Sequence, residues 1–116
     1  MIQTKRVYEK PDKKDGFRIL VDRLWPRGLT KERAQVDLWM KEIAPSDALR
    51  KWFHHEGMNW SEFVKRYKAE IVKKKGLLSE LKKLESEHRT VTLLFGSKDE
   101  KQNQAVVLEE ILQGQK

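Results

Sequence analysis

A cluster of charged residues follows the first strongly apolar run of the chain. Asp22 and Arg23 come directly after residues 19–21, and Arg27 follows four positions later. Arginines beside a turn suit a phosphate or a carboxylate, because the planar guanidinium group binds such anions through paired hydrogen bonds. Asp22 is the candidate catalytic residue, as a base or as a metal-linked carboxylate. The alternative is that Asp22 and the arginines pair with each other at a strand end, since ion-pair networks are common.

A second group of polar residues follows the other strongly apolar run, residues 90–95. Ser97 and Lys98 come directly after it, and Asn103 stands near the start of a final helix. Open α/β sheets bind ligands beyond the carboxyl ends of their strands, so parallel strands would bring both groups to one basic pocket. The ligand-binding residues that we expect there are Arg23, Trp25, Arg27, Gly28, Ser97, Lys98 and Asn103.

The elements that position these residues follow from periodicity and turn chemistry. Residues 2–8, 17–21 and 90–95 read as strands, and residues 36–40 as a short edge strand. The polar loop 9–16 is short for a parallel crossover, which leaves the direction of the first strand open. Between the two polar groups, Gly28 permits a backbone conformation barred to other residues, and Thr30 can cap a helical turn that starts at Lys31.

The middle of the chain reads as a series of amphipathic helices. Ser46 and Asn59 are good N-caps, the second with Glu62 three residues later. Gly57 and Gly76 are expected to end the two helices that follow these caps, and a last helix is expected from about residue 102 to 113. Strands followed by helices, a strand and a helix predict a small, mostly parallel α/β sheet with helices packed on it, in one domain.

Several kinds of chemistry are excluded or disfavoured by the residues present. The chain has no cysteine, which rules out disulfides, thiolate metal sites and a cysteine nucleophile. The adjacent His54 and His55 cannot easily converge on one ion, and neither has a suitable partner four residues away. We therefore expect no metal site, and no motif requires a particular cofactor.

Composition keeps two other functions open. The 116 residues carry a net charge of +7, which favours anionic partners. A nucleic-acid-binding protein is one alternative, with a basic helical surface formed by Arg50, Lys51, Lys65, Arg66 and Lys68. A protein-interaction module anchored by exposed tryptophans is the other. No apolar segment predicts a signal peptide or a membrane span, so a cytoplasmic protein without membrane contact is expected.

The sequence also resembles a known family. The run from Asp15 to Gly28 closely resembles the signature of the YeaO-like branch of the domain of unknown function 488 family. The resemblance extends over nearly the whole chain, including residues 44–46, residues 49–53 and residues 92–94. It implies a small α/β protein with parallel strands, and therefore the shared pocket. It implies no established reaction.

Two regions depart from the pattern of the larger relatives. Those proteins often have a Cys-Glu pair after the last strand and a Cys-His-Arg motif at the start of the last helix. Here residues 95–97 read Phe-Gly-Ser, and residues 103–105 read Asn-Gln-Ala. Close relatives often have histidine where Gln104 stands. Chemistry that depends on that cysteine or histidine is therefore not expected of this chain.

Overall fold

The four strands form one parallel sheet, as the sequence predicts. The computed structural model describes residues 1–55 and 59–114. Strands β1 (Ile2–Arg6), β2 (Phe17–Leu20), β3 (Leu38–Trp39) and β4 (Val91–Phe95) lie in the order β1-β4-β2-β3, with β3 at an edge. β1 pairs in parallel with β4, from Ile2 opposite Val91 to Arg6 opposite Phe95. The open question about the first strand is thus settled by a partner almost ninety residues away.

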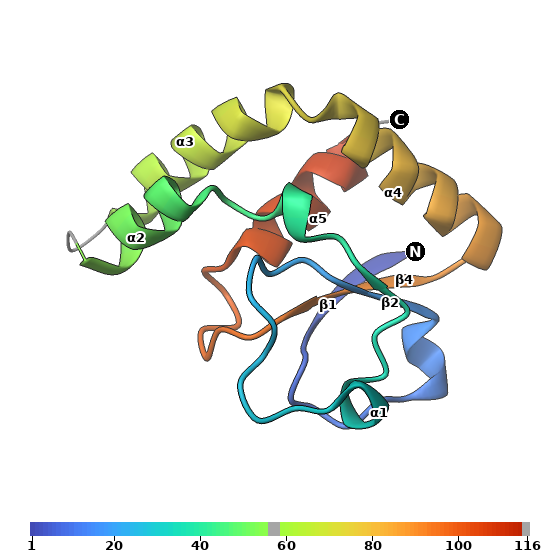
Figure 1. Ribbon diagram of the computed structural model, residues 1–116. Helices are drawn as coiled ribbons and strands as arrows, with labels where there is room; N and C mark the ends of the chain where they lie inside the picture. The colour runs from blue at the N-terminus through green and yellow to red at the C-terminus, as the bar shows by residue number, and fades with distance from the viewer. Residues whose placement is uncertain (56–58, 115–116) are drawn as a thin grey trace.

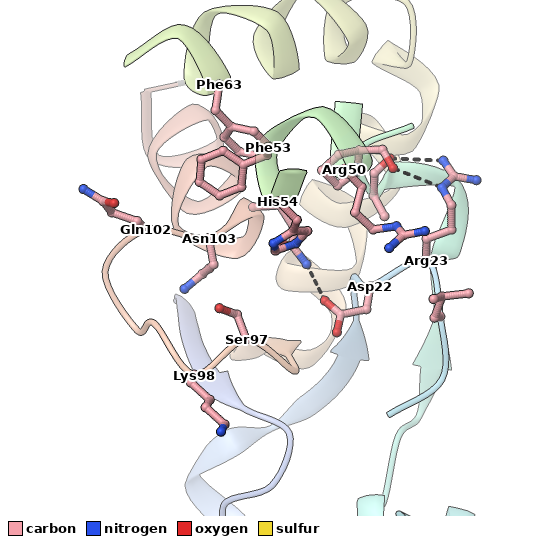
Figure 2. Close-up of a pocket in the computed structure, with 14 residues that line it drawn as sticks. Asp22, Arg23, Arg50, Phe53, His54, Phe63, Ser97, Lys98, Gln102 and Asn103 are labelled. Atoms are coloured by element: carbon pink, nitrogen blue, oxygen red, sulfur yellow. Dashed lines mark hydrogen bonds between the residues drawn. The ribbon is translucent and has the colours of Figure 1, made fainter. Parts of the chain in front are cut away.

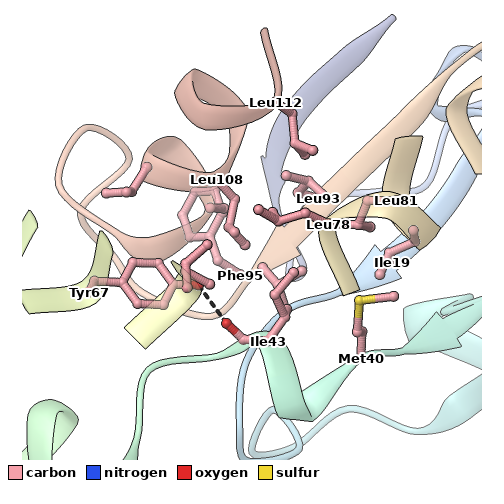
Figure 3. Packing of buried hydrophobic residues seen from close by; sticks show 14 of the residues in the cluster. Ile19, Met40, Ile43, Tyr67, Leu78, Leu81, Leu93, Phe95, Leu108 and Leu112 are labelled. Atoms are coloured by element: carbon pink, nitrogen blue, oxygen red, sulfur yellow. Dashed lines mark hydrogen bonds between the residues drawn. The ribbon is translucent and has the colours of Figure 1, made fainter. Parts of the chain in front are cut away.

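Both faces of the sheet are covered, and the covering differs from one face to the other (Figure 1). Successive strand residues point to opposite faces. Ile19, Leu93 and Phe95 accordingly pack into the large core beneath the long helices, whereas Leu20 and Leu94 pack on the other side. The large core also holds Tyr67, whose hydroxyl donates to the Ile43 carbonyl at 2.6 Å (Figure 3). Residues from the turn after β2 cover the second face.

Helices α2 (Asp47–His55), α3 (Trp60–Val72), α4 (Lys75–His88) and α5 (Gln104–Gly114) form the layer over the large core. The short α1 (Lys31–Ala34) lies on the other face, and two 3-10 turns, η1 (Lys13–Asp15) and η2 (Lys41–Ile43), complete the chain. The expected caps are confirmed: Thr30 accepts from Arg33 N–H, Asn59 accepts from Glu62 N–H, and Ser46 accepts from Leu49 N–H.

The predicted helix break at Gly76 is wrong. The chain turns at Lys73 and Lys74 instead, and Gly76 lies in the first turn of α4. Lys74 Nζ donates to the carbonyls of Glu42 and Ala44, at 2.6 and 3.2 Å, and so ties this corner to the segment before α2. A tertiary contact therefore sets the break, and glycine is tolerated in a first helical turn. The helix end expected at Gly57 falls outside the described residues.

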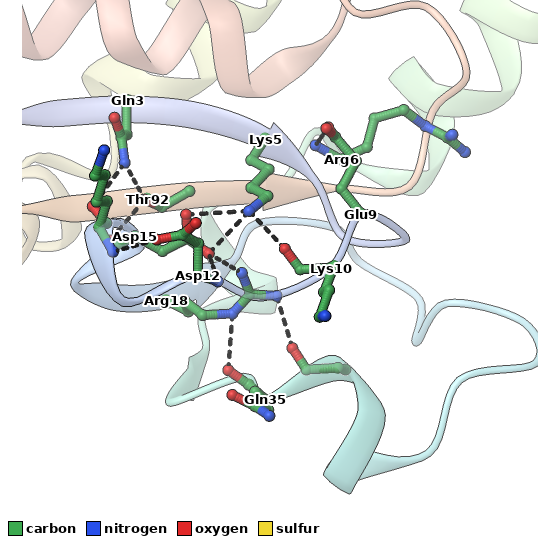
Figure 4. A network of polar contacts seen from close by, with 12 residues as sticks. Gln3, Lys5, Arg6, Glu9, Lys10, Asp12, Asp15, Arg18, Gln35 and Thr92 are labelled. Carbon is green, nitrogen blue, oxygen red and sulfur yellow. Dashed lines mark hydrogen bonds and ion pairs between the residues drawn. The ribbon is translucent and has the colours of Figure 1, made fainter.

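A buried ion-pair network joins the start of β2 to β1 and to α1 (Figure 4). The Arg18 guanidinium donates to the Asp15 carboxylate at 2.5 Å, and also to the carbonyls of Ala34 and Gln35. Lys5 Nζ lies 3.1 Å from the same carboxylate. Burial raises the pKa of Asp15, but hydrogen bonds from the Asp12 N–H, Lys5 and Arg18 more than offset this, and the pKa is lowered. The polar loop before β2 is thereby fixed.

Candidate functional site

A cavity of about 460 Å³ opens at the carboxyl ends of β2 and β4, beneath α2 and beside the start of α5 (Figure 2). Five residues expected from the sequence line it, namely Asp22, Arg23, Ser97, Lys98 and Asn103. The two polar groups that follow the apolar strands therefore meet at one edge of the sheet. They do so because β2 and β4 are adjacent and parallel.

Asp22 is the only carboxylate among the described residues that line the cavity. Its Oδ2 accepts the Gly96 N–H at 2.8 Å, and its Oδ1 accepts the side-chain amide of Gln104. A Cβ atom at position 96 would lie 2.9 Å from Oδ2, so glycine allows this close approach. Burial raises the pKa of Asp22 to about 6, and the two hydrogen bonds counteract only part of that rise.

Arg23 is oriented by backbone carbonyls. Its Nε donates to the Pro45 carbonyl at 3.0 Å and its Nη2 to the Ala44 carbonyl at 3.3 Å. Neither Arg23 nor Arg27 forms an ion pair with Asp22 within residues 1–55 and 59–114. The alternative of a mutual ion-pair network at the strand end is therefore wrong. Arg23 instead keeps its charge at the cavity wall.

Helix α2 contributes three further side chains to the cavity, namely Arg50, Phe53 and His54. Arg50 Nε is buried and has no hydrogen-bond partner among the described residues. An unpaired buried donor costs about 1–3 kcal/mol, so an acceptor from a ligand would remove an existing penalty. The other contact of the guanidinium is a 3.4 Å pair with the exposed Asp47, which contributes little at such a surface.

The position of α2 depends on a clamp at its N-terminus. Glu70 in α3 accepts both the Ser46 N–H at 2.9 Å and the Ser46 hydroxyl at 2.6 Å. Tyr67, one turn earlier in α3, holds the Ile43 carbonyl. Arg23 and Lys74 hold the Ala44–Pro45 backbone from two other directions. The segment before α2 is therefore fixed, and Arg50 projects from a rigid element.

The loop from Gly96 to Asn103 forms the opposite wall. Arg6 in β1 donates to the Ser97 carbonyl at 2.9 Å, and Ser97 Oγ accepts the Asp99 N–H at 3.1 Å. Asn103 is buried and caps α5: its Oδ1 accepts the Val106 N–H, and its amide donates to the Asp99 carbonyl. Asn103 thus shapes the wall, and Lys98 is the exposed cation on it.

Three other expected residues lie away from the cavity. Trp25 Nε1 donates to the Leu29 carbonyl at 2.7 Å, and its indole packs edge-on against Trp39 over the smaller core. Arg27 is exposed, and its carbonyl accepts the Tyr8 hydroxyl. Gly28 has φ of +82°, which confirms the turn that was expected there. The turn after β2 therefore folds over the opposite face of the sheet.

Sequence reasoning missed several cavity residues, namely Arg50, Phe53, His54 and Phe63. Phe53 and Phe63 share the apolar stripes of their helices, a pattern that by itself indicates core positions. His54 lacks the spacing of a metal ligand, and Arg50 belongs to the run of basic residues that predicts a basic helical surface. One signal was available: residues 49–53 belong to the family resemblance, yet Arg50 is too polar for a core position.

The described part of the chain offers little support for a metal site, a membrane span or an exposed aromatic patch. No three histidine, aspartate or glutamate side chains within residues 1–55 and 59–114 converge as they would around a metal ion. No described helix is long and apolar enough to cross a membrane. The four tryptophans are each partly buried, and the exposed large apolar residues within 1–55 and 59–114 are Met1, Tyr8, Leu24 and Val72.

Comparisons with known proteins place the chain in a family. The model of a family described as the inactive DUF488-N3 subclade matches residues 1–116. The chain is 44% identical over 107 residues to the uncharacterized protein YeaO of Escherichia coli K12, which covers 92% of each chain. It is 39% identical over 113 residues to the uncharacterized proteins Rv3073c of Mycobacterium tuberculosis and Mb3100c of Mycobacterium bovis, covering 97% of this chain and 94% of theirs. No solved structure gives a significant match.

Proposed function

Because the chain belongs to the inactive DUF488-N3 subclade, we propose that it is a binding protein that holds a small anionic ligand at the carboxyl ends of β2 and β4. The observation that carries this proposal is the charge of the cavity lining. Three cationic residues, Arg23, Arg50 and Lys98, line the cavity together with a single carboxylate, Asp22, among the described lining residues. A cavity whose lining carries a net positive charge favours a phosphate or carboxylate group.

Arg50 is the residue most suited to contact the anion. Its guanidinium lines the cavity, and its buried Nε has no partner among the described residues. Arg23 already uses two of its N–H groups on backbone carbonyls, so it supplies charge and a smaller number of free donors. Lys98 is exposed and can approach a ligand from the loop side as a mobile point charge.

The description of the family as inactive supports a role in binding rather than catalysis. Among the described residues that line the cavity, Asp22 is the one acidic group placed to act as a base, and its oxygens already accept hydrogen bonds from Gly96 and Gln104. The chain has no cysteine that could act as a nucleophile. If a reaction does occur, Asp22 remains the group to test.

The proposal is tested by a thermal-shift screen of the intact protein at low and moderate salt. The panel contains inorganic phosphate, carboxylates, nucleotides, sugar phosphates, divalent metals and short oligonucleotides. A ligand that binds the native state raises the melting temperature, and the rise grows with the logarithm of the ligand concentration above its Kd. We expect small anions to stabilise the protein, and Arg50→Gln to reduce their affinity at least tenfold, since a charge-assisted hydrogen bond contributes about 1.5–3 kcal/mol.

Lys51→Gln is the matched control, because it removes the same charge from the same helix at an exposed position outside the cavity lining. Equal loss of affinity in both variants would contradict the proposed site. Stabilisation by oligonucleotides alone, fading steeply with salt, would instead favour the nucleic-acid alternative. On that surface Arg66 is already engaged, because it pairs with Glu62 and lies 3.8 Å from the Trp52 ring.

A further inference from the structure

We infer that the anion bound here is carried on a flat, apolar ring system, so that the ligand class is an aromatic acid. This inference rests on the proposed function and narrows it. It is argued from three features of the cavity: its size, its rigid aromatic wall, and the separation of that wall from the cationic end.

The cavity is larger than an isolated anion needs. Its volume of about 460 Å³ lies within the range of about 300–1,000 Å³ that is typical of sites for small organic molecules. Leu24, Ala44 and Pro45 contribute apolar surface to the lining, in addition to the two phenyl rings. A phosphate or carboxylate at the arginines would leave this apolar surface exposed to water. The remaining volume therefore favours a ligand with an apolar body.

The aromatic wall is pre-formed. Phe53 and Phe63 lie with their ring centroids 4.4 Å apart, and Phe63 stacks in turn on Trp60 and Tyr67, at 5.3 and 5.8 Å. Phe63 is 3% exposed, whereas Phe53 is only partly buried, and both residues line the cavity. Because Trp60, Phe63 and Tyr67 all belong to α3, few side chains need to become ordered when the flat ring of a ligand packs against this wall.

The acid-binding end lies on the other side of the same cavity. Figure 2 shows the rings of Phe53 and Phe63 apart from Arg23 and Arg50, with Asp22 below the arginines. A ligand that fills both ends has its ring against Phe53 and its acidic group at Arg50, whose buried Nε has no described partner. Asp22 limits the charge that the site accepts, so an acid with one ionised group fits better than a multiply charged phosphate.

Three probes separate the contributions of the ring and the acid. These are 2-naphthoate, its saturated counterpart decahydro-2-naphthoate, and the neutral 2-naphthamide, with inorganic phosphate as the minimal anion. Affinities are measured by isothermal titration calorimetry on the wild type, Phe53→Leu, Arg50→Gln and the control Phe17→Leu. Phe17 also packs at the edge of the large core but lies against His88, away from the cavity lining.

We expect 2-naphthoate to bind more tightly than decahydro-2-naphthoate and 2-naphthamide. Phe53→Leu should lower the affinity for 2-naphthoate about three- to tenfold, the usual range for loss of one aromatic contact, and leave that for the saturated acid unchanged. Phe17→Leu should alter neither. Equal affinities for the flat and saturated acids, or binding of phosphate alone, would overturn the aromatic class while leaving the proposed function intact. If no anion binds, both the aromatic ligand class and the proposed anion-binding function are wrong.

Discussion

The side chain of Gln104, at the start of α5, donates its amide to the carboxylate of Asp22, at the end of β2. Together with the Gly96 N–H, it fixes the one acidic group of the described cavity lining. The contact joins two positions 82 residues apart in sequence. Burial raises the pKa of Asp22, and the Gly96 and Gln104 donors counteract part of that rise because each stabilises the charged form.

Asp22 makes the protein less stable as the pH rises. Its pKa is about 6 in the folded protein and 3.8 in the unfolded chain, so the folded state holds the proton more tightly. The stabilisation is complete below pH 3.8 and is lost as the pH rises through about 6. The whole effect amounts to about 3 kcal/mol. The unfolding free energy of the wild type, minus that of Asp22→Asn, should therefore fall over this interval.

Urea denaturation of both proteins at several pH values between 3.5 and 8 measures that difference. Subtracting the variant removes the contribution of the other carboxylates, which titrate in both proteins. The Asn side chain keeps an acceptor for Gly96, and Gln104 can rotate its amide to accept from it. A difference that stays constant with pH would show that Asp22 titrates normally.

The ion pair of Asp15 and Arg18 has the opposite dependence. The pKa of Asp15 is lowered in the folded protein, so its stabilisation is present above pH 3.8 and is lost as the pH falls through the folded value. Removing one partner leaves the other charge buried and unpaired. Arg18→Met should therefore cost about 3–5 kcal/mol of unfolding free energy. The same substitution at the exposed Arg33 should cost under ~0.5 kcal/mol, and comparable losses at both positions would be the contrary result.

Two glycines offer a matched test of backbone strain. Gly16 has φ of +64°, and a Cβ there would lie 2.3 Å from the Thr90 carbonyl oxygen; Gly28 has φ of +82° with open space around it. Gly28→Ala should cost only the conformational term of about 1–2 kcal/mol. Gly16→Ala adds a clash with backbone worth about 1–3 kcal/mol more. Thermal denaturation should rank them in that order, and the reverse order would refute the assigned packing.

The caps show which features a sequence can predict. Thr30, Ser46 and Asn59 act on N–H groups three residues away, so their roles follow from local sequence and are confirmed. The parallel sheet was predicted from the two apolar strands and from the family resemblance, and it is confirmed. The resemblance itself is confirmed by the family model, which matches residues 1–116. The direction of β1 depends on its pairing with β4, and local sequence carries no signal for it.

The cavity was only half predictable for the same reason. Asp22, Ser97 and Lys98 follow strands directly, so their meeting is a consequence of sheet topology. Arg50 and Phe53 enter the cavity because Glu70 clamps Ser46 and thereby places α2 above the strand ends. That contact links two helices through side chains 24 residues apart. Arg27 was expected there as well, but the turn that bears it folds across the opposite face, where Trp25 packs on Trp39.

The most direct test of the proposed anion site follows the Arg50 side chain itself. Inorganic phosphate is titrated into ¹⁵N-labelled protein, and the arginine Nε–H signals are recorded by NMR, which detects even millimolar binding. Arg66 serves as the internal reference, because its Nε donates to Glu62 on the exposed face of α3. We expect the Arg50 Nε–H signal to shift in a saturable way, and the backbone amide signals of residues 22–24 and 96–98 to shift with it. Shifts of equal size at Arg66, or none at Arg50, would contradict the account.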